Sequence, residues 1–296
     1  VLVATTAWLL VSANIVTFSF LTVLFALLIV AAVSYFVTRA TGGDFLSHLK
    51  ANARRFMWME LLLLVAFVAF LLVRAANPDL WETYKGGEKP MDFAYLNAVV
   101  RSTILPPYDP WYAGGYLNYY YFGQFMIASL IRLTGIVPSV AYNLAVPLLF
   151  AFTMGGVYSI VSGLAELTLR ARRLPAWSKR SPIYAGLAAA ALVAVAGNIH
   201  GLLQLLQGAS RVFFQDGMFG EFDFWRSSRM MEPDTGANEI TEFPYFTFLF
   251  ADLHAHLIAI PIAITAFAAT IAAYLRIGRR RPWAESLAGL FVIGVL

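Results

Sequence analysis

Three ionisable residues stand at the edge of an apolar segment. Asp252, His254 and His256 come directly before residues 257–275, a run without charged side chains. Ionisable groups at a membrane boundary are costly, so they indicate a functional role. On a helix Asp252 and His256 would share a face and His254 would point away, whereas an extended segment would align the two histidines. We expect this set to hold a cation or to orient a substrate through hydrogen bonds; a structural polar cluster is the alternative.

A second acidic position lies in a segment with the period of an amphipathic helix. Asp92 and Glu88, four residues apart, precede apolar residues at helical spacing, namely Phe93, Leu96, Val100 and Ile104. We expect this helix to lie at the membrane surface. Asp92 suits its N-cap, which is the structural interpretation. In the functional interpretation Asp92 is a general base or metal ligand, and Glu88 adds a second carboxylate.

Aromatic and basic side chains accompany these acids. The aromatic set suits either the headgroup level of a bilayer or the stacking of a sugar or lipid, and it comprises Trp111, Tyr119, Tyr120 and Tyr121. Arg226 and Arg229 would share a helical face and could clamp a phosphate, with Arg101 behind them. Pairing with neighbouring acids is the alternative for these arginines.

The elements that must position these groups are membrane helices. Of the 296 residues 60% are hydrophobic and 13% charged, which excludes an ordinary soluble enzyme. Uncharged runs of bilayer length cover residues 16–37, 138–165 and 183–206. The absence of cysteine in these residues excludes thiolate chemistry and disulfides. We therefore predict an all-α, polytopic transmembrane helical bundle with two external loops that carry short interfacial helices.

The distribution of charge predicts the topology. Three clusters hold 13 of the 21 Lys and Arg residues, and the positive-inside rule makes the loops at about 39–55, 168–182 and 276–282 cytoplasmic. The loops at about 77–117 and 207–243 carry 12 of the 17 acids and should be external. Because the basic residues flank apolar spans, they indicate topology and not a nucleic-acid partner. Residues 1–296 read as one membrane-domain fragment, truncated at both ends within apolar runs.

One stretch of this topology has two solutions. The charge pattern requires an odd number of crossings between Leu117 and Glu166, yet residues 118–131 and 138–165 are both apolar. The first is 14 residues, about 21 Å as a helix, which is short of a bilayer core of roughly 30 Å. We expect a re-entrant or tilted segment there; in the alternative both segments cross and the basic cluster near Arg170 is external.

Several of these motifs together resemble a known family. The chain is similar to the YYY multi-pass membrane proteins of archaea and Chloroflexus-like bacteria, named for a tyrosine triplet. The resemblance covers most of the chain and rests on residues 89–97, 109–111, 115–123, 225–229 and 242–256. This family is in turn similar to the GT-C superfamily of membrane glycosyltransferases, which carry an acidic motif early in the first external loop.

The resemblance implies a function. It places Asp92 at the position of the catalytic base, which deprotonates an acceptor hydroxyl as it attacks the sugar of a polyprenyl-phosphate donor. Residue 93 is Phe where a second acid would stand, and Glu88 is the nearest replacement. The implied partners are the lipid-linked sugar, a glycan or protein acceptor and membrane lipids, with Mg²⁺ or Mn²⁺ as a possible cofactor. The site would face the outside of the plasma membrane.

A second function class uses the same residues differently. A transporter or flippase for a lipid or polar solute would use Asp252, His254 and His256 as a relay for protons or ions. The enzyme requires Asp92, Asp252 and the arginines to meet in one external site, whereas a relay requires polar groups along the spans. Few polar groups lie within the spans, which favours the enzyme.

Overall fold

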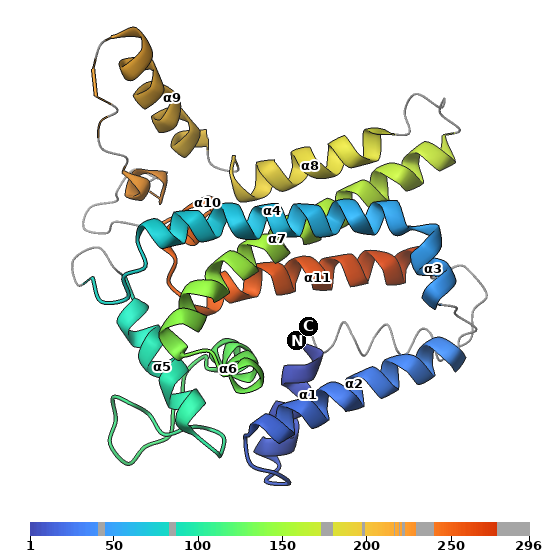
Figure 1. Cartoon of the computed structure of the whole chain (residues 1–296), viewed down its shortest axis with the longest axis vertical. Helices are drawn as coiled ribbons and strands as arrows, with labels where there is room; N and C mark the ends of the chain where they lie inside the picture. Colours follow the sequence, from blue (N-terminus) through green and yellow to red (C-terminus); the bar gives the residue numbers. More distant parts are fainter. Residues whose placement is uncertain are drawn as a thin grey trace.

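The computed structural model describes residues 1–40, 45–82, 87–172, 180–196, 199–215, 217–218, 220, 223–228 and 240–276. These residues form an all-α structure (Figure 1), in which the only strand-like pairing described is an isolated bridge between Tyr108 and Tyr116. The elements, in chain order, are α1 (Leu2–Ser12), α2 (Phe20–Ala40), α3 (Phe45–Ala51), α4 (Ala53–Ala76), α5 (Lys89–Arg101), α6 (Phe122–Thr134), α7 (Pro138–Ala171), α8 (Ser181–Ala194), α9 (Ile199–Phe214), the 3-10 helix η2 (Phe224–Ser228), α10 (Pro244–Phe250) and α11 (Ala255–Arg276).

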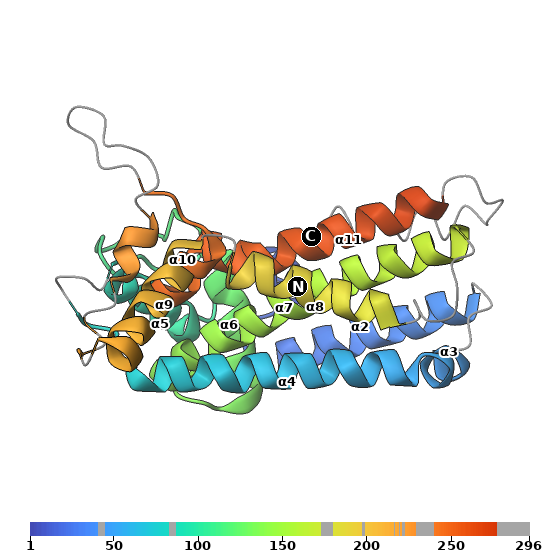
Figure 2. The same ribbon diagram turned by 90° about the horizontal axis from the view of Figure 1, so that it is seen from above.

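Four helices of the described chain are long and apolar enough to cross a bilayer, namely α2, α4, α7 and α11. They run side by side along the bundle (Figure 2). Much of their surface is apolar and exposed, because lipid replaces water around a membrane helix. The prediction of an all-α polytopic bundle is therefore confirmed.

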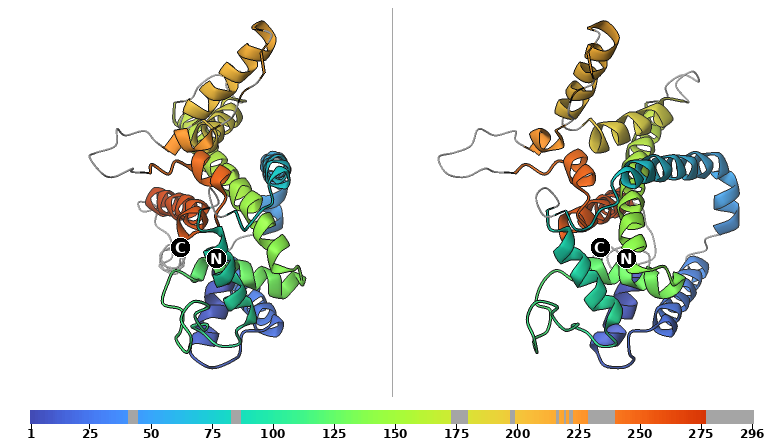
Figure 3. Two further views of the ribbon diagram at one scale, coloured as in Figure 1. Left: turned by 90° about the vertical axis from the view of Figure 1, so that its left-hand side faces the viewer. Right: turned by 60° about the vertical axis from the view of Figure 1, so that its left-hand side comes forward.

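The uncharged run at residues 183–206 does not form the single straight span that its length predicts. It divides between α8 and α9, which meet at 88° across a break of at most four residues. Helix α9 stands away from the bundle (Figure 3) and continues to Phe214, into the segment predicted as an external loop. Apolar length alone does not distinguish one span from two helices at an angle, and Gly197 and Asn198 at the break lie outside the described residues.

Helix α6 is the short apolar segment on which the topology depends. It has 13 residues, fewer than a span requires, and ends at Gly135 in the left-handed conformation. In Figure 1 its axis points toward the viewer, while α4, α7 and α11 run across the picture. Helix α7 is thus the one span-length helix between Leu117 and Glu166, as the short-segment alternative predicts.

The bundle has two ends (Figure 2), and the described charged residues are distributed unevenly between them. One end carries the start of α4 and the last turns of α2, α7 and α11, where the basic residues include Arg39, Arg54, Arg55, Arg170 and Arg276. The other end carries α5, α6, α10 and the loops that contain Asp79, Asp109, Asp223, Glu242 and Asp252. This second end also carries basic residues, namely Arg74, Lys89, Arg101, Arg132 and Arg226. The excess of basic residues at the first end is therefore partial, in the direction that the positive-inside rule expects of a polytopic protein.

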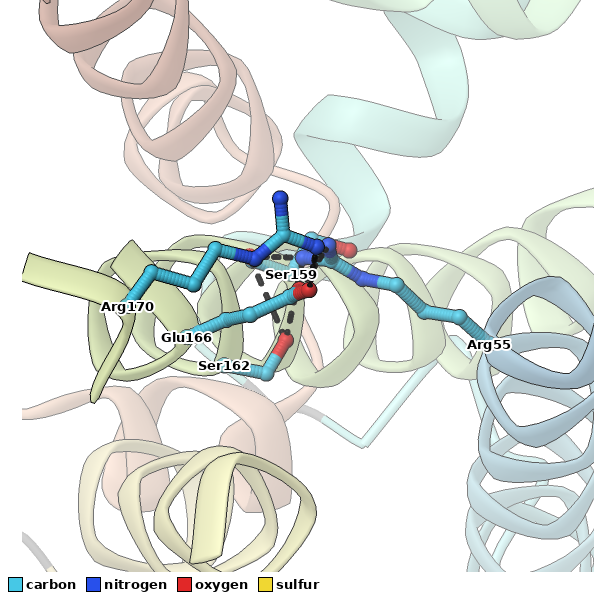
Figure 4. Close-up of polar contacts among 5 residues, drawn as sticks. All are labelled: Arg55, Ser159, Ser162, Glu166 and Arg170. Atoms are coloured by element: carbon cyan, nitrogen blue, oxygen red, sulfur yellow. Dashed lines mark hydrogen bonds and ion pairs between the residues drawn. The ribbon is translucent and has the colours of Figure 1, made fainter. Parts of the chain in front are cut away.

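A polar clamp joins α4 to α7 near the basic end (Figure 4). Arg55 Nη1 lies 3.1 Å from Glu166 Oε2, and Arg170 pairs with the other oxygen of Glu166. Arg55 Nη2 also donates to the Ser159 carbonyl and to Ser162 Oγ, each at 3.4 Å. A side chain at Gly163 would bring a Cβ within 3.1 Å of Arg55 Nη2, so the small residue leaves room for the guanidinium. The clamp links two neighbouring spans by polar contacts.

Aromatic packing fixes the opposite end. Phe70 of α4 stacks on Phe150 of α7 with ring centroids 4.5 Å apart, and Phe248 of α10 packs edge-on against both rings. Aromatic pairs in these geometries stabilise a core beyond their buried area. The packing holds α10 against the spans, and α10 leads directly to Asp252.

Candidate active site

The first turn of α5 places Asp92 inside the protein. The helix begins at Lys89, with Glu88 as N-cap and Pro90 in the first turn, where proline is tolerated. Asp92 therefore is not the N-cap; it lies within the first turn, and its N–H donates to the Glu88 carbonyl at 2.9 Å. Its side chain shares the buried face of α5 with Leu96 and Val99. This face packs on α6 and α7, so α5 is part of the packed helical structure at one end of the bundle.

The segment between α10 and α11 is not helical. Ala251 ends α10 in the left-handed conformation, and α11 begins only at Ala255. Leu253 is held from both sides, because its N–H donates to the Tyr142 hydroxyl at 2.6 Å and its carbonyl accepts from Gln124 Nε2 at 3.2 Å. Asp252 and His256 therefore do not share a helical face, whereas His254 and His256 lie together, which is the arrangement expected of the extended alternative.

Four polar side chains from three parts of the chain lie buried together. Asp92 is 0% exposed, Gln124 1%, Asp252 3% and Lys89 6%. Gln124 Nε2 lies 3.5 Å from Asp92 Oδ1, at the limit of a hydrogen bond. Among the described atoms, Asp92 Oδ2, Gln124 Oε1 and Asp252 Oδ1 are buried without a hydrogen-bond partner. Such orphans are costly, and three of them in one place indicate a site for a ligand that donates hydrogen bonds.

Burial controls the charge of this cluster. It raises the pKa of Asp92 to about 8, and the nearby carboxylates of Asp252 and Glu88 act in the same direction, while Lys89 opposes them. Burial also lowers the pKa of Lys89 to about 8, against the attraction of Asp252 and Asp92. The pKa of Asp252 is raised by burial and held back by His256, Lys89 and His254. The pKa values of Asp92 and Lys89 thus both lie near 8, in the range that suits a general acid or base.

A chain of imidazoles and carboxylates lies beside the buried cluster. His254 Nε2 lies 3.1 Å from Glu88 Oε2 and 3.0 Å from the Tyr119 hydroxyl. His254 Nδ1 lies 3.0 Å from Nδ1 of His256. His256 Nε2 lies 2.9 Å from Glu242 Oε2, an ion-pair distance without the alignment of a hydrogen bond. The chain ties α5 and α11 to the segment that precedes α10.

An aromatic stack connects η2 to the buried lysine. Lys89 Nζ lies 4.4 Å from the centroid of the Phe250 ring, within cation–π range. Trp225 of η2 packs edge-on against the same ring at 4.9 Å. Gly87 also packs here, in the left-handed conformation, where a Cβ would meet Phe250 Cζ at 2.1 Å. Gly87 is therefore required both by its backbone angle and by space.

The structure brings six of the twelve predicted site residues together, and these are Glu88, Asp92, Tyr119, Asp252, His254 and His256. Tyr120 is exposed and packs on the Tyr119 ring, while Tyr121 accepts a hydrogen bond from Trp8 Nε1 at 3.2 Å. Trp111 is 66% exposed in the loop after α5.

The three predicted arginines are not part of this cluster as described. Arg101 is exposed at the far end of α5, about 13 Å along the helix from Asp92 at ~1.5 Å per residue. Arg226 is exposed on η2, where its N–H donates to the Asp223 carbonyl at 3.3 Å. Arg229 lies outside the described residues. The cation that the structure places at the carboxylates is Lys89 instead.

Three residues that build the site were not among the predicted ones, and they are Lys89, Gln124 and Tyr142. Each had a weak signal in the sequence. Lys89 precedes a proline at a helix start, and Gln124 is the one amide in the apolar segment of α6. Tyr142 lies near the start of a span, where a hydroxyl can bond across helices.

The residues do not fit a metal ion as they are arranged. No group of three His, Asp or Glu side chains among the described residues is placed to ligate one. Magnesium and manganese favour several oxygen ligands, whereas here the charge of Lys89 also interacts with the two buried carboxylates.

Comparison with known proteins gives a family and no function. Neither the curated proteins nor the solved structures contain a match to this chain. A family model described as "Uncharacterized membrane protein (DUF2298)" matches residues 2–296. The family model covers almost the whole chain, and the described helices include apolar spans. The chain therefore belongs to the DUF2298 family of membrane proteins.

Proposed function

We propose that this protein is a membrane glycosyltransferase of the GT-C type that transfers a sugar from a polyprenyl-phosphate donor to an acceptor hydroxyl. The observation that carries the proposal is the fully buried Asp92, whose Oδ2 has no partner among the described residues and whose pKa is raised to about 8 by burial. A carboxylate with this pKa is suited to general-base catalysis at neutral pH.

The proposed reaction has one proton acceptor and one displaced phosphate. The acceptor hydroxyl donates a hydrogen bond to Asp92 Oδ2. The hydroxyl proton passes to Asp92 as the hydroxyl oxygen bonds to the anomeric carbon of the sugar. The bond from that carbon to the phosphate oxygen breaks, and the electron pair leaves with the phosphate. Lys89, whose charge interacts with both buried carboxylates, is the candidate to stabilise the negative charge of the leaving group. No step requires a metal ion.

Gln124 and Asp252 have a positioning role in this proposal. Their unpartnered oxygens, Oε1 and Oδ1, are acceptors. Sugar and acceptor hydroxyls are donors that can satisfy them. A ligand rich in hydroxyls thus suits these buried acceptors better than an anion does, and the arrangement supports a glycosyl substrate.

The division of charge supports an external position for the site. The basic ends of α2, α4, α7 and α11 gather opposite α5 and α10 (Figure 2). If the basic end is cytoplasmic, as the positive-inside rule expects, Asp92 lies toward the outer face of the membrane, which supports the proposed site outside the plasma membrane. Polyprenyl-linked donors in the membrane and a glycan or protein acceptor outside it would then meet at this end.

The transporter alternative receives less support. The contacts from Glu242 through His256 and His254 to Glu88 stay at one end of the bundle. A relay for transport needs polar groups through the bilayer. The described spans bury few of them, namely Thr22, Thr153, Ser162 and, in the last turn of α4, Arg74.

The test is sugar transfer by the full-length protein in lipid nanodiscs with a defined polyprenyl-phosphate sugar. Asp92→Asn keeps the shape of the side chain and removes the base, so we expect product formation to fall by roughly a hundredfold or more. The matched control is Asp109→Asn in the same external segment, since Asn retains the oxygen that accepts from the Trp111 and Tyr112 N–H groups. Full transfer by a folded Asp92→Asn protein would refute the proposal.

A further inference from the structure

Helix α9 has a polar side and an apolar side. At ~100° per residue, the polar side is made by His200, Gln204, Gln207 and Arg211. The apolar side carries large side chains that are exposed, and these include Leu202, Leu203, Leu205, Leu206, Phe213 and Phe214. A continuous exposed apolar surface of this kind marks a site of contact with a membrane or another protein.

The polar side of α9 faces the protein. Gln204 Nε2 donates to the Asp223 carbonyl at 2.8 Å, and Gln204 Oε1 accepts from the Asp223 N–H at 2.9 Å. One turn earlier, a Cβ at Gly201 would meet the hydroxyl oxygen of Tyr245 at 2.3 Å, so α9 also approaches the start of α10 closely. A helix in water turns its apolar side to the protein, whereas α9 turns that side outward. This orientation is typical of a helix whose outer environment is lipid.

The lipid-facing surface of the bundle continues onto α9 through α8. Helix α8 packs along α7 and runs beside the spans (Figures 1 and 2), and its Tyr184, Leu187 and Leu192 side chains are exposed. At the end of α8 the chain turns by 88° into α9. Because α8 runs along the bundle, α9 lies closer to the plane of the membrane than to its normal. Amphipathic helices in this orientation bind the boundary between headgroups and acyl chains.

Helix α9 is also tied to the candidate active site. Asp223, which pairs with Gln204, directly precedes η2. Trp225 of η2 packs against the Phe250 ring at 4.9 Å, and Lys89 Nζ lies 4.4 Å from the centroid of the same ring. The polar side of α9 therefore holds the outer end of the aromatic stack that covers Lys89.

We propose that the apolar side of α9 binds the bilayer surface at the site end of the bundle, and that this contact holds η2 against Phe250. The partner is a lipid surface because the apolar side continues from the lipid-facing α8 and lacks charge. Arg211, the one Lys, Arg, Asp or Glu residue of α9, is on the polar side. The inference does not depend on sugar transfer, since it rests on the contacts of α8, α9 and η2.

The first test places spin labels on the two sides of α9. The 296 residues contain no cysteine, so each single Cys variant adds one label site to this part of the full-length protein. Leu206→Cys and Phe213→Cys probe the apolar side, and Gln207→Cys probes the polar side one residue away. Leu64→Cys on the exposed face of α4 is the lipid reference. The protein is held in nanodiscs of phosphatidylcholine and phosphatidylglycerol, with oxygen as the relaxant that enters lipid and a nickel chelate as the relaxant that stays in water.

We expect oxygen to relax the labels at 206 and 213 strongly and the nickel chelate to relax them weakly, as at position 64. The order should reverse at position 207. Weak relaxation by both reagents at 206 and 213 would mean that protein covers this side, from a second copy or from the rest of the chain, and would overturn the proposal. Strong relaxation by the nickel chelate there would place α9 in water and would overturn it as well.

The second test measures the link to η2 by backbone hydrogen exchange of residues 223–228 in the same nanodiscs. Gln204→Leu removes both bonds to Asp223, so we expect exchange about tenfold faster, an effect of ~1.4 kcal/mol. The double variant Leu206→Glu, Phe213→Glu should act in the same direction, because it weakens the lipid contact and leaves Gln204 in place. Gln207→Leu is the matched control and should leave exchange unchanged. Exchange in 223–228 that neither Gln204→Leu nor the double variant alters would show that α9 does not hold η2.

Discussion

Nδ1 of His254 lies 3.0 Å from Nδ1 of His256, so one proton must lie between two ring nitrogens. The outer nitrogens of the two rings lie 3.1 Å from Glu88 Oε2 and 2.9 Å from Glu242 Oε2. One ring therefore donates to the other, and the pair lies between the start of α5 and the segment that precedes α10.

The first prediction concerns the contact between the two rings. In protein labelled with ¹⁵N-histidine, we expect Nδ1 of one ring to give the signal of a protonated nitrogen and Nδ1 of the other ring that of a hydrogen-bond acceptor. His200 is the internal control, because its Nδ1 lies 3.1 Å from Gln204 Nε2, an amide nitrogen that only donates. Two Nδ1 signals without the signature of a hydrogen bond between them would show that the rings do not share a proton.

The second prediction concerns stability and pH. Burial raises the pKa of Asp92 from 3.8 to about 8, so folding favours the protonated acid. Its contribution is fully present below about pH 4 and is lost as the pH rises to 8, with a slope on the order of 1 kcal/mol per pH unit. Thermal unfolding between pH 5 and 7.5 should show a falling midpoint, and the fall should be smaller in Asp92→Asn. A slope that Asp92→Asn leaves unchanged, as Asp109→Asn should, would contradict the raised pKa.

The third prediction concerns the pH dependence of transfer. The base form of Asp92 and the charged form of Lys89 coexist only near pH 8, so kcat/KM should follow a narrow bell around that value. Lys89→Met removes an attraction that lowers the pKa of Asp92, so the acidic limb should move to higher pH. Asp252→Asn removes a repulsion that raises it, so the limb should move to lower pH. Shifts in the same direction would show that the two groups do not act through Asp92.

The fold was largely predictable because its main signal is composition. A run such as residues 138–165 has one stable solution in a bilayer, and it becomes α7. The run at 183–206 had two solutions, one straight span or two helices at an angle, and its length favoured the wrong one. The first turn of a helix tolerates proline, so α5 begins at Lys89, before Pro90. Asp92 therefore lies within the helix and not at its N-cap.

The site was only half predictable because its partners are distant in sequence. Asp92 and Asp252 are recognisable as costly acids near apolar segments, but their proximity depends on the packing of α5, α6, α7 and α10. Gln124 and Tyr142 are the hydrogen-bond partners of the Leu253 backbone. In the sequence they are single polar residues within apolar helices. A phosphate clamp was expected from exposed arginines, whereas burial of Lys89 depends on Phe250, 161 residues away.

The fourth prediction concerns the clamp at the basic end (Figure 4). The side chains of Arg55 and Glu166 are 40% and 37% exposed, so solvent screens their attraction. Glu166→Gln should cost at most about 1 kcal/mol of unfolding free energy and leave sugar transfer unchanged. Denaturant unfolding in detergent and the transfer assay measure both. A large loss of transfer in a stable Glu166→Gln protein would show that the basic end communicates with the site.

The fifth prediction concerns the support of the Asp252 segment. The Tyr142 hydroxyl accepts the N–H of Leu253, the residue between Asp252 and His254. Tyr142→Phe leaves that buried donor without a partner, at a cost of about 1–3 kcal/mol. Because a small displacement of reacting groups is expensive, we expect kcat to fall by roughly ten- to a hundredfold.

The matched control for this variant is Tyr158→Phe, a buried tyrosine of the same helix outside the site. It tests whether loss of a tyrosine hydroxyl from α7 alone affects transfer. Gln124→Leu removes the contact to the Leu253 carbonyl. If Tyr142 acts by holding Leu253, the two contacts act as one unit, and adding Gln124→Leu to Tyr142→Phe should reduce kcat little further. Full additivity of the two effects would mean that Gln124 acts through Asp92, to which it also bonds.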